Sequence, residues 1–254
     1  MDGTQTSRRS EQALTFKTRR SRRPGRLGAV VLEELAHAVI SGAFAEGTVL
    51  PREPTLCEEF GFSRTVIREG LKLMEERGLV RVEQGRGTKV QPRDSWNLLD
   101  PVVIRIALEY DHDMALLDNL IAVRRVLERE MARAAAFRIT DDELTELEKS
   151  IDEMESAYDD YARFRAADLA FHATVMKASG NEVGLTVVRI IHTHAGITAP
   201  LADASPRAGL ERSATEHRAI FDALAARDGE LAGDRIAAHI DFAWAERKGT
   251  GTRT

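Results

Sequence analysis

The spacing of apolar residues changes abruptly near residue 93 of this 254-residue chain. Before that point, short apolar segments alternate with glycine and proline; after it, apolar residues recur every three or four positions almost to the end. Such a recurrence is typical of amphipathic helices, which must bury their apolar faces against one another. The sequence therefore predicts a mostly α protein with a small N-terminal domain at 27–92, a polar linker at 93–98 and an all-α helical bundle at 99–248.

The N-terminal domain is expected to be a winged helix-turn-helix. Glycines follow the apolar segments of helical spacing, and Ser63 is a favourable N-cap for the third of these helices. Branched residues on both sides of a glycine-rich turn then predict a small β-hairpin, which is the wing. The expected elements are helices ending at Gly42 and Gly61, a helix from Ser63 to about Arg77, and a hairpin over 79–90.

Polar residues at the start of the third helix are candidate contacts to DNA. A hydroxyl at a helix N-terminus, as at Ser63 and Thr65, suits a phosphate group. Arg64 has the length and the planar fork to contact guanine, and Arg68 follows one turn later on the same side. The alternative is that these are the solvated charges of an ordinary helix. The wing residues expected to meet the DNA backbone or the minor groove, or to be merely solvated, are Gly85, Arg86 and Lys89.

The net charge of −5 hides a basic N-terminus. Residues 1–27 carry a net charge of +6, whereas residues 93–254 carry −9. We therefore expect residues 1–26 to form a disordered basic tail that meets a polyanion. An Arg-rich, acid-poor start is also typical of an organelle transit peptide, which is the alternative.

The cysteine count and the hydropathy limit the classes of protein. Cys57 is the single cysteine, which excludes a disulfide framework and a thiolate metal cluster and favours a reducing, cytoplasmic setting. No segment approaches the ~20 apolar residues of a membrane helix, so we expect no membrane partner. The helices expected after the linker are 99–109, 114–138, 141–158, 160–179, 182–198, 208–226 and 229–247, followed by a tail at 249–254.

Four polar residues of the predicted bundle lie on helix faces that are otherwise apolar. Asp168 and His172 are four residues apart and share a face, and His217 and His239 lie on the apolar faces of the last two helices. A buried aspartate is unfavourable unless it is paired or binds a metal. One Asp and three His suit a divalent transition metal, first of all Zn²⁺, with Ni²⁺ and Mn²⁺ as alternatives. For each histidine alone, the alternative is a hydrogen-bonded core or surface imidazole.

The segment from Gly42 to Val90 resembles the DNA-binding domain of the GntR family of bacterial transcription regulators. The matching strings are Leu50-Pro51, Ser63-Arg64-Thr65, Arg68-Glu69-x-Leu71, Gly78-Leu79-Val80 and Gly85-x-Gly87-Thr88-x-Val90. The resemblance implies a DNA-binding winged helix-turn-helix. Where this chain has Pro54, family members often have an arginine that contacts DNA, and Arg52 is the candidate to replace it.

Most of the bundle resembles the FCD effector domain of the FadR-like subgroup of that family. The resemblance rests on Arg124-x-x-Leu127-Glu128, Asp168-x-x-Phe171-His172, Ser179-Gly180-Asn181, Glu216-His217-Arg218-Ala219-Ile220 and Ala238-His239. It implies that Asp168, His172, His217 and His239 hold a metal ion. It also implies that Arg124 contacts the carboxylate of an effector, unless it pairs with Glu128, and that Asn181 lines the pocket, unless it caps the following helix.

These features predict a transcription regulator and not an enzyme. We expect a cytoplasmic, nucleoid-associated bacterial repressor that binds a palindromic operator in double-stranded DNA as a homodimer through 27–92. A small carboxylate would bind at the metal in the effector-binding and dimerisation domain, 99–248, and change the affinity for DNA. The alternatives are a sensor of the metal ion itself, a metal-dependent enzyme fused to a DNA-binding module, and an acyl-CoA sensor.

Overall fold

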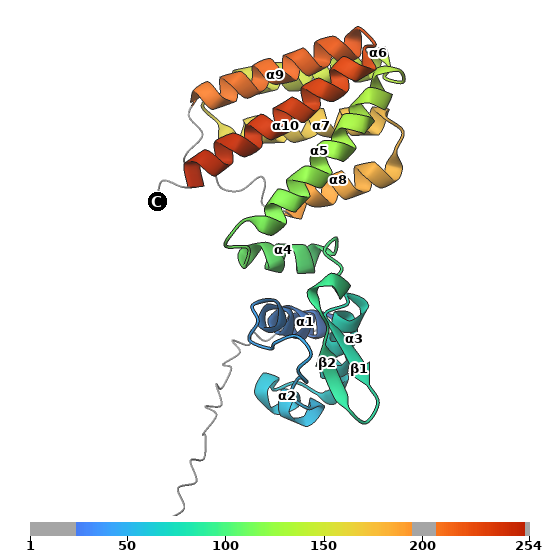
Figure 1. Cartoon of the computed structure of the whole chain (residues 1–254), viewed down its shortest axis with the longest axis vertical. Coiled ribbons are helices and arrows are strands. Elements are labelled where there is room, and N and C mark those ends of the chain that lie inside the picture. The colour runs from blue at the N-terminus through green and yellow to red at the C-terminus, as the bar shows by residue number, and fades with distance from the viewer. Residues whose placement is uncertain (1–23, 195–206, 252–254) are drawn as a thin grey trace, which may run out of the picture. The chain divides into compact units, whose positions relative to one another are not determined.

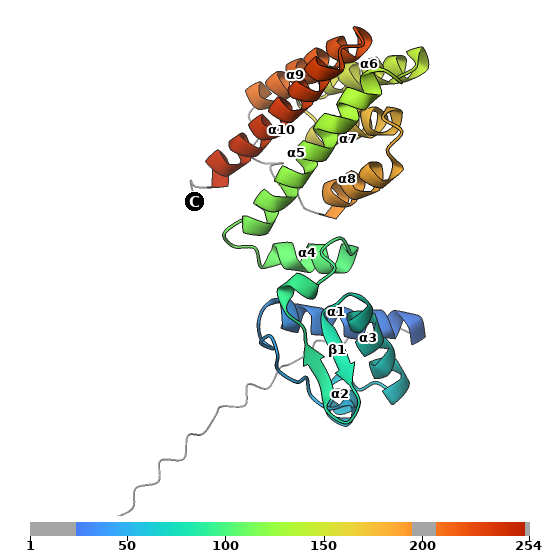
Figure 2. The same ribbon diagram turned by 45° about the vertical axis from the view of Figure 1, so that its right-hand side comes forward.

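The structure, a computed structural model, describes residues 24–194 and 207–251 and divides into two compact units between Asn97 and Leu98 (Figures 1 and 2). It confirms a mostly α fold with one small antiparallel sheet. The proposed basic tail, 1–26, lies outside the described residues except for its last three, which already belong to the first helix. The last helix likewise continues into the proposed C-terminal tail, as far as Gly251.

The N-terminal unit is a winged helix-turn-helix, as predicted. Its elements are α1 (Pro24–Ile40), α2 (Glu53–Phe60), α3 (Arg64–Glu76), β1 (Val80–Glu83), β2 (Gly87–Val90) and the short 3-10 helix η1 (Arg93–Ser95). The strands pair antiparallel, with Val80 opposite Val90 and Glu83 opposite Gly87. An isolated bridge between Val49 and Lys89 ties the segment before α2 to the wing.

Helix α3 packs its apolar face on α1 and presents its polar N-terminal turn outward. Gly70 lies where α3 crosses α1, and a β-carbon there would overlap the side chain of Val31. Ser63 occupies the N-cap position as predicted, with extended backbone, but its side chain makes no capping hydrogen bond. After α3, Gly78 adopts a φ of +72°, and a β-carbon there would overlap the carbonyl oxygen of Ser95. The turn from α3 into the wing therefore requires glycine for two reasons, the positive φ and the close approach of the Ser95 carbonyl oxygen.

The C-terminal unit is the predicted helical bundle. Each helix expected from the sequence is present, although the part of 182–198 beyond His194 lies outside the described residues. The helices are α4 (Pro101–Glu109), α5 (Ala115–Ala136), α6 (Asp141–Ser156), α7 (Tyr161–Ala178), α8 (Glu182–His194), α9 (Arg207–Ala225) and α10 (Gly229–Gly251).

The long helices of the bundle surround one apolar core. Helix α5 lies alongside α10, α9 packs on α10, and α6 packs against both α7 and α9 (Figures 1 and 2). Helix α8 contacts α5 and α7, and the short α4 contacts α5 and α8. Side chains of the core that are fully buried include Leu147, Ile151, Met154, Phe171, Ile220 and Ile236.

Local signals in the sequence set where the bundle helices begin. Thr140 and Glu143 form a reciprocal capping box at the start of α6, where each side chain bonds the backbone N–H of the other. Asp160 caps α7 by accepting a hydrogen bond from the backbone N–H of Arg163. These caps fix the residues at which α6 and α7 begin.

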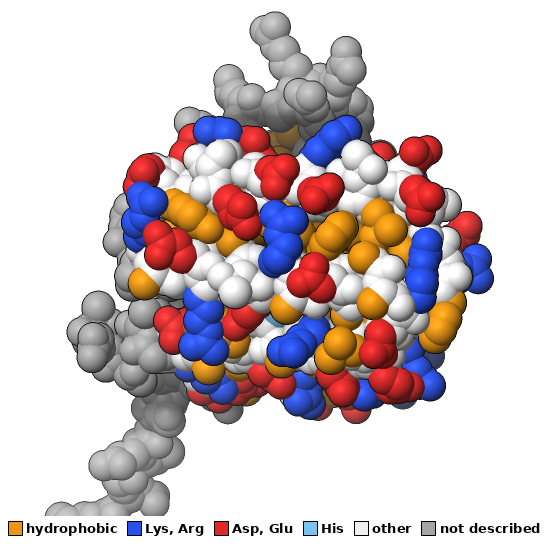
Figure 3. Space-filling view, turned by 90° about the horizontal axis from the view of Figure 1, so that it is seen from above, with side chains coloured by type: hydrophobic (Ala, Val, Ile, Leu, Met, Phe, Trp, Pro, Cys, Tyr) orange, Lys and Arg blue, Asp and Glu red, His pale blue; other side chains and the backbone are white. Residues whose placement is uncertain are grey.

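One face of the bundle is covered by interspersed charges. Figure 3, which looks onto the part of the bundle drawn at the top of Figure 1, shows acidic and basic side chains interspersed, with apolar areas between them. Between α9 and α6, Arg218 pairs with Asp152 and Glu155 at 3.3 and 3.4 Å. No described helix has an apolar segment long enough to cross a membrane.

Candidate metal centre

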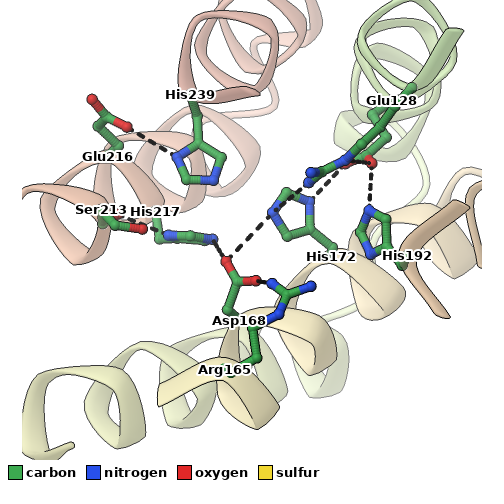
Figure 4. A network of polar contacts seen from close by, with 10 residues as sticks. Glu128, Arg165, Asp168, His172, His192, Ser213, Glu216, His217 and His239 are labelled. Carbon is green, nitrogen blue, oxygen red and sulfur yellow. Dashed lines mark hydrogen bonds and ion pairs between the residues drawn. The ribbon is translucent and has the colours of Figure 1, made fainter. Parts of the chain in front are cut away.

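The four polar residues predicted to share a site do meet in the bundle (Figure 4). Asp168 and His172 come from α7, His217 from α9 and His239 from α10. Each offers one ligand atom, and these atoms all lie within 4.8 Å of one another. All four side chains are buried. Three helices therefore converge on one small polar volume inside an apolar core.

Each of the three histidines donates a hydrogen bond through Nδ1 to a fixed acceptor. His172 Nδ1 lies 2.6 Å from Glu128 Oε2, His217 Nδ1 lies 2.8 Å from the carbonyl oxygen of Ser213, and His239 Nδ1 lies 2.9 Å from Glu216 Oε2. A carbonyl or a carboxylate can only accept, so Nδ1 must carry the proton in each ring. In a neutral imidazole, Nε2 is then left with its lone pair.

The Nε2 atoms point toward the carboxylate of Asp168. His217 Nε2 and His172 Nε2 lie 3.2 and 3.8 Å from Asp168 Oδ1. His217 Nε2 is buried and has no hydrogen-bond partner among residues 24–194 and 207–251. A lone pair facing a carboxylate oxygen at this distance is unfavourable unless a cation lies between them. The donor set and its orientation therefore fit a divalent transition metal.

Electrostatics keeps these groups in the protonation states that a metal requires. Burial lowers the pKa of His172 to about 3, and burial also lowers the pKa of His239, so both rings are neutral at neutral pH. Burial alone would raise the pKa of Asp168, but that pKa lies well below its usual value, and the neighbouring charge of Arg165 contributes to lowering it. The carboxylate of Asp168 and the neutral imidazoles of His172 and His239 are therefore available as ligands.

Glu128 connects the centre to two further helices, a role that sequence reasoning missed. Its side chain is fully buried and accepts from His172 Nδ1, from Arg124 Nε at 2.6 Å and from His192 Nε2 at 3.0 Å. Burial would raise the pKa of Glu128, but the charge of Arg124 and the hydrogen bond from His172 keep it well below its usual value. Its position four residues after Arg124 suggested only a local ion pair.

Arg124 has the predicted ion pair and also lies next to the centre. Besides bonding Glu128, its Nη2 lies 3.4 Å from His172 Nε2. A guanidinium can only donate, so this contact independently requires that Nε2 is an acceptor. Asn181 lies elsewhere: it is exposed, and its side-chain oxygen accepts from the backbone N–H of Gly184 at 2.9 Å, which caps α8.

The predicted DNA-contacting residues all lie exposed on the N-terminal unit. Arg64 and Thr65 begin α3, and Arg68 lies one turn later, where its Nε pairs with Glu53 of α2 at 2.9 Å. Sequence reasoning missed this ion pair because it joins two helices. The exposed set is Arg52, Ser63, Arg64, Thr65, Arg68, Gly85, Arg86 and Lys89.

Comparison with known families and proteins agrees with both units. Residues 27–90 match the family described as bacterial regulatory proteins, gntR family, and residues 119–242 match the FCD domain. The chain is 32% identical to the galactonate operon transcriptional repressor of Escherichia coli K12 over 198 residues, which cover 78% of this chain and 86% of that protein. It is 27% identical to the transcriptional repressor NanR of Klebsiella aerogenes over 222 residues, which cover 85% and 83%.

A solved structure shares the fold. The structure of Lar, a protein that controls the expression of the Listeria monocytogenes agr system, superposes on this chain with a TM-score of 0.54 at 18% identity. The match covers 90% of this chain and 95% of that one. At this level of identity the likeness concerns the fold alone.

We predict that the purified protein binds one divalent transition-metal ion per chain at Asp168, His172, His217 and His239. The change His217→Ala should weaken metal binding by more than about 100-fold. Loss of a residue that only hydrogen-bonds to a metal ligand costs less than that. The matched control is His192→Ala, which removes another buried histidine that contacts Glu128 but is not one of the four ligands. Elemental analysis and competition with a chromogenic chelator measure both. Equal metal content in the two variants would contradict the assignment.

Proposed function

The chain belongs to the GntR family of bacterial transcription regulators and carries an FCD domain, and from that premise we propose that it is a repressor controlled by a small carboxylate. It is a transcription regulator and not an enzyme, since its relatives are named as regulators. The proposal rests on one observation above all. The buried donor set lies beside the guanidinium of Arg124, which is 3.4 Å from His172 Nε2.

This arrangement favours an anionic ligand. When bound at Asp168, His172, His217 and His239, a metal ion supplies a Lewis acid that accepts an anionic oxygen; Zn²⁺ fits best, and Ni²⁺ or Mn²⁺ also suit these donors. Arg124 supplies a charged donor beside it. Glu128, Ser213 and Glu216 hold the three imidazoles in the orientation that a ligand would meet. The name of the galactonate operon repressor, which refers to a sugar acid, supports a carboxylate effector.

The N-terminal unit would read DNA through α3 and the wing. Arg64 lies at the exposed start of α3 and is suited to a guanine edge, while Ser63, Thr65 and the wing residues Arg86 and Lys89 are suited to the backbone. Two chains in a homodimer would present two such helices to a palindromic operator, in the bacterial cytoplasm at the nucleoid. Effector binding would then shift the dimer between states of different DNA affinity.

A second candidate function is direct sensing of the metal ion. The observation that favours it is that four protein ligand atoms lie within 4.8 Å of one another, a number sufficient to hold a metal ion. In that case the metal alone would change the affinity for DNA, and organic acids would have no further effect. Binding of operator DNA with the metal, with the metal and an acid, and with neither separates the two functions.

We predict that Arg64→Ala abolishes the discrimination between operator and scrambled DNA. A good bidentate contact to a base contributes ~1–3 kcal/mol of discrimination. Deletion of residues 1–22 is the matched comparison, because arginines of the basic tail can only add attraction to phosphates. The deletion should lower the affinity for both DNAs and flatten its dependence on salt. Titrations at several salt concentrations test both statements, and an equal loss for the two DNAs in Arg64→Ala would contradict the role of Arg64.

We predict that effector affinity depends on both the metal and Arg124. Calorimetric screening of organic and sugar acids, beginning with galactonate, identifies the acid to be used. Removing the metal with a chelator should eliminate most of the affinity, and Arg124→Lys should reduce it less, because lysine keeps the charge but not the planar fork. The control is Arg125→Lys, at an exposed arginine that pairs with Asp241 at 3.3 Å. Unchanged affinity in the folded metal-free protein would mean that the metal is purely structural.

A further inference from the structure

Arg165 is a partly buried arginine of the metal centre that the proposed function does not use. Its side chain is 18% exposed, and Nη1 pairs with Oδ2 of Asp168, the carboxylate oxygen on the other side from the histidines. Figure 4 shows Arg165 rising from α7 to this carboxylate. The contact orients the metal ligand Asp168 but involves only one of the three guanidinium nitrogens.

The remaining edge of this guanidinium has no partner among the residues that the structure describes. Arg165 Nε and Nη2 are both buried, and neither has a hydrogen-bond partner in the described part of the chain. Buried polar groups, charged ones above all, are almost always hydrogen-bonded, so an open pair of N–H groups needs an explanation. Nε and Nη2 lie on one edge of the guanidinium. Their N–H groups can donate parallel hydrogen bonds to the two oxygens of one carboxylate. The open edge therefore has the shape of an anion site.

The charges around the centre also favour a second anion. Glu128 and Asp168 are balanced by Arg124 and Arg165, and Glu216 is balanced by Arg212 at 3.2 Å. The carboxylates and guanidinium groups of this set cancel in charge, so a divalent metal would add two positive charges that no described residue of the set offsets. One carboxylate would leave this excess only partly neutralised.

We propose that the open edge of Arg165 is a second anion subsite and that the effector is a short dicarboxylate. One carboxylate binds at the metal and Arg124, and the other binds Nε and Nη2 of Arg165. The inference rests on the proposed function, because it requires an organic acid at the metal centre. A hydroxyl group of a monocarboxylate also accepts hydrogen bonds, but it does not neutralise the second charge.

The test compares acids that differ only in the second carboxylate. Malonate, succinate and glutarate are titrated calorimetrically into the metal-loaded full-length protein, each beside the monocarboxylate of the same carbon number: propionate, butyrate and valerate. At least one dicarboxylate should bind about tenfold or more tightly than its monocarboxylate, since a hydrogen bond to a charged group contributes about 1.5–3 kcal/mol. Metal content is measured in parallel.

Variants of α7 assign this preference to Arg165. Arg165→Gln keeps an amide donor for Asp168 but removes the charge and the fork, so the ratio of dicarboxylate to monocarboxylate affinity should fall to about one. The control is Arg163→Gln, at an exposed arginine of the same helix that pairs with Glu153 at 2.6 Å, and it should keep the preference. If Arg165→Gln loses the metal, Arg165→Lys retains a charge beside Asp168 and should still lose most of the preference.

The outcomes separate the subsite from the proposed function. Equal binding of dicarboxylates and monocarboxylates, or a preference that survives in Arg165→Gln, would overturn the Arg165 subsite and leave the carboxylate-controlled repressor standing. If none of the six acids, nor any sugar acid, binds the metal-loaded protein, the organic-acid function itself is wrong and the subsite fails with it.

Discussion

The hydrogen bond from His172 Nδ1 to Glu128, at 2.6 Å, is the interaction on which the organisation of the bundle interior depends. A carboxylate buried as completely as Glu128 is strongly unfavourable unless charged or polar donors surround it. Its three donors come from α5, α7 and α8, so satisfying one carboxylate fixes three helices relative to one another. The same bond sets the proton of His172 on Nδ1. One buried acid therefore both joins three helices and sets the tautomer of a candidate metal ligand.

The other two histidines repeat this arrangement with different acceptors. Ser213 offers a backbone carbonyl of α9, and Glu216 offers a carboxylate from the same helix to His239 of α10. In each case the outer acceptor holds the ring so that its other nitrogen points inward, which is how proteins commonly orient metal-binding histidines. The centre is thus positioned by hydrogen bonds within and between helices.

The sequence predicted the helices and the four inward polar residues because both follow from spacing along one helix. Asp168 and His172 share a face at four residues apart, whatever packs against them. The contacts that it did not predict run between elements. The bond of Glu128 to α7 and α8, and that of Arg68 to Glu53, depend on how each helix is rotated in the packed fold. Arg165 was missed for a related reason: a charge three residues before an aspartate is typical of an exposed helix face, and only the packing buries it.

The central claim is that His172, His217 and His239 carry their protons on Nδ1 and present Nε2 to a metal. Long-range ¹H–¹⁵N NMR spectra of the metal-free protein at neutral pH measure this directly, because the ¹⁵N shift of each ring nitrogen reports whether it bears a proton. Spectra of single His→Gln variants assign the rings. The account predicts three neutral rings protonated at Nδ1, whose Nε2 signals alone shift strongly when Zn²⁺ is added. Rings protonated at Nε2, or Nε2 signals that Zn²⁺ leaves unchanged, would contradict it.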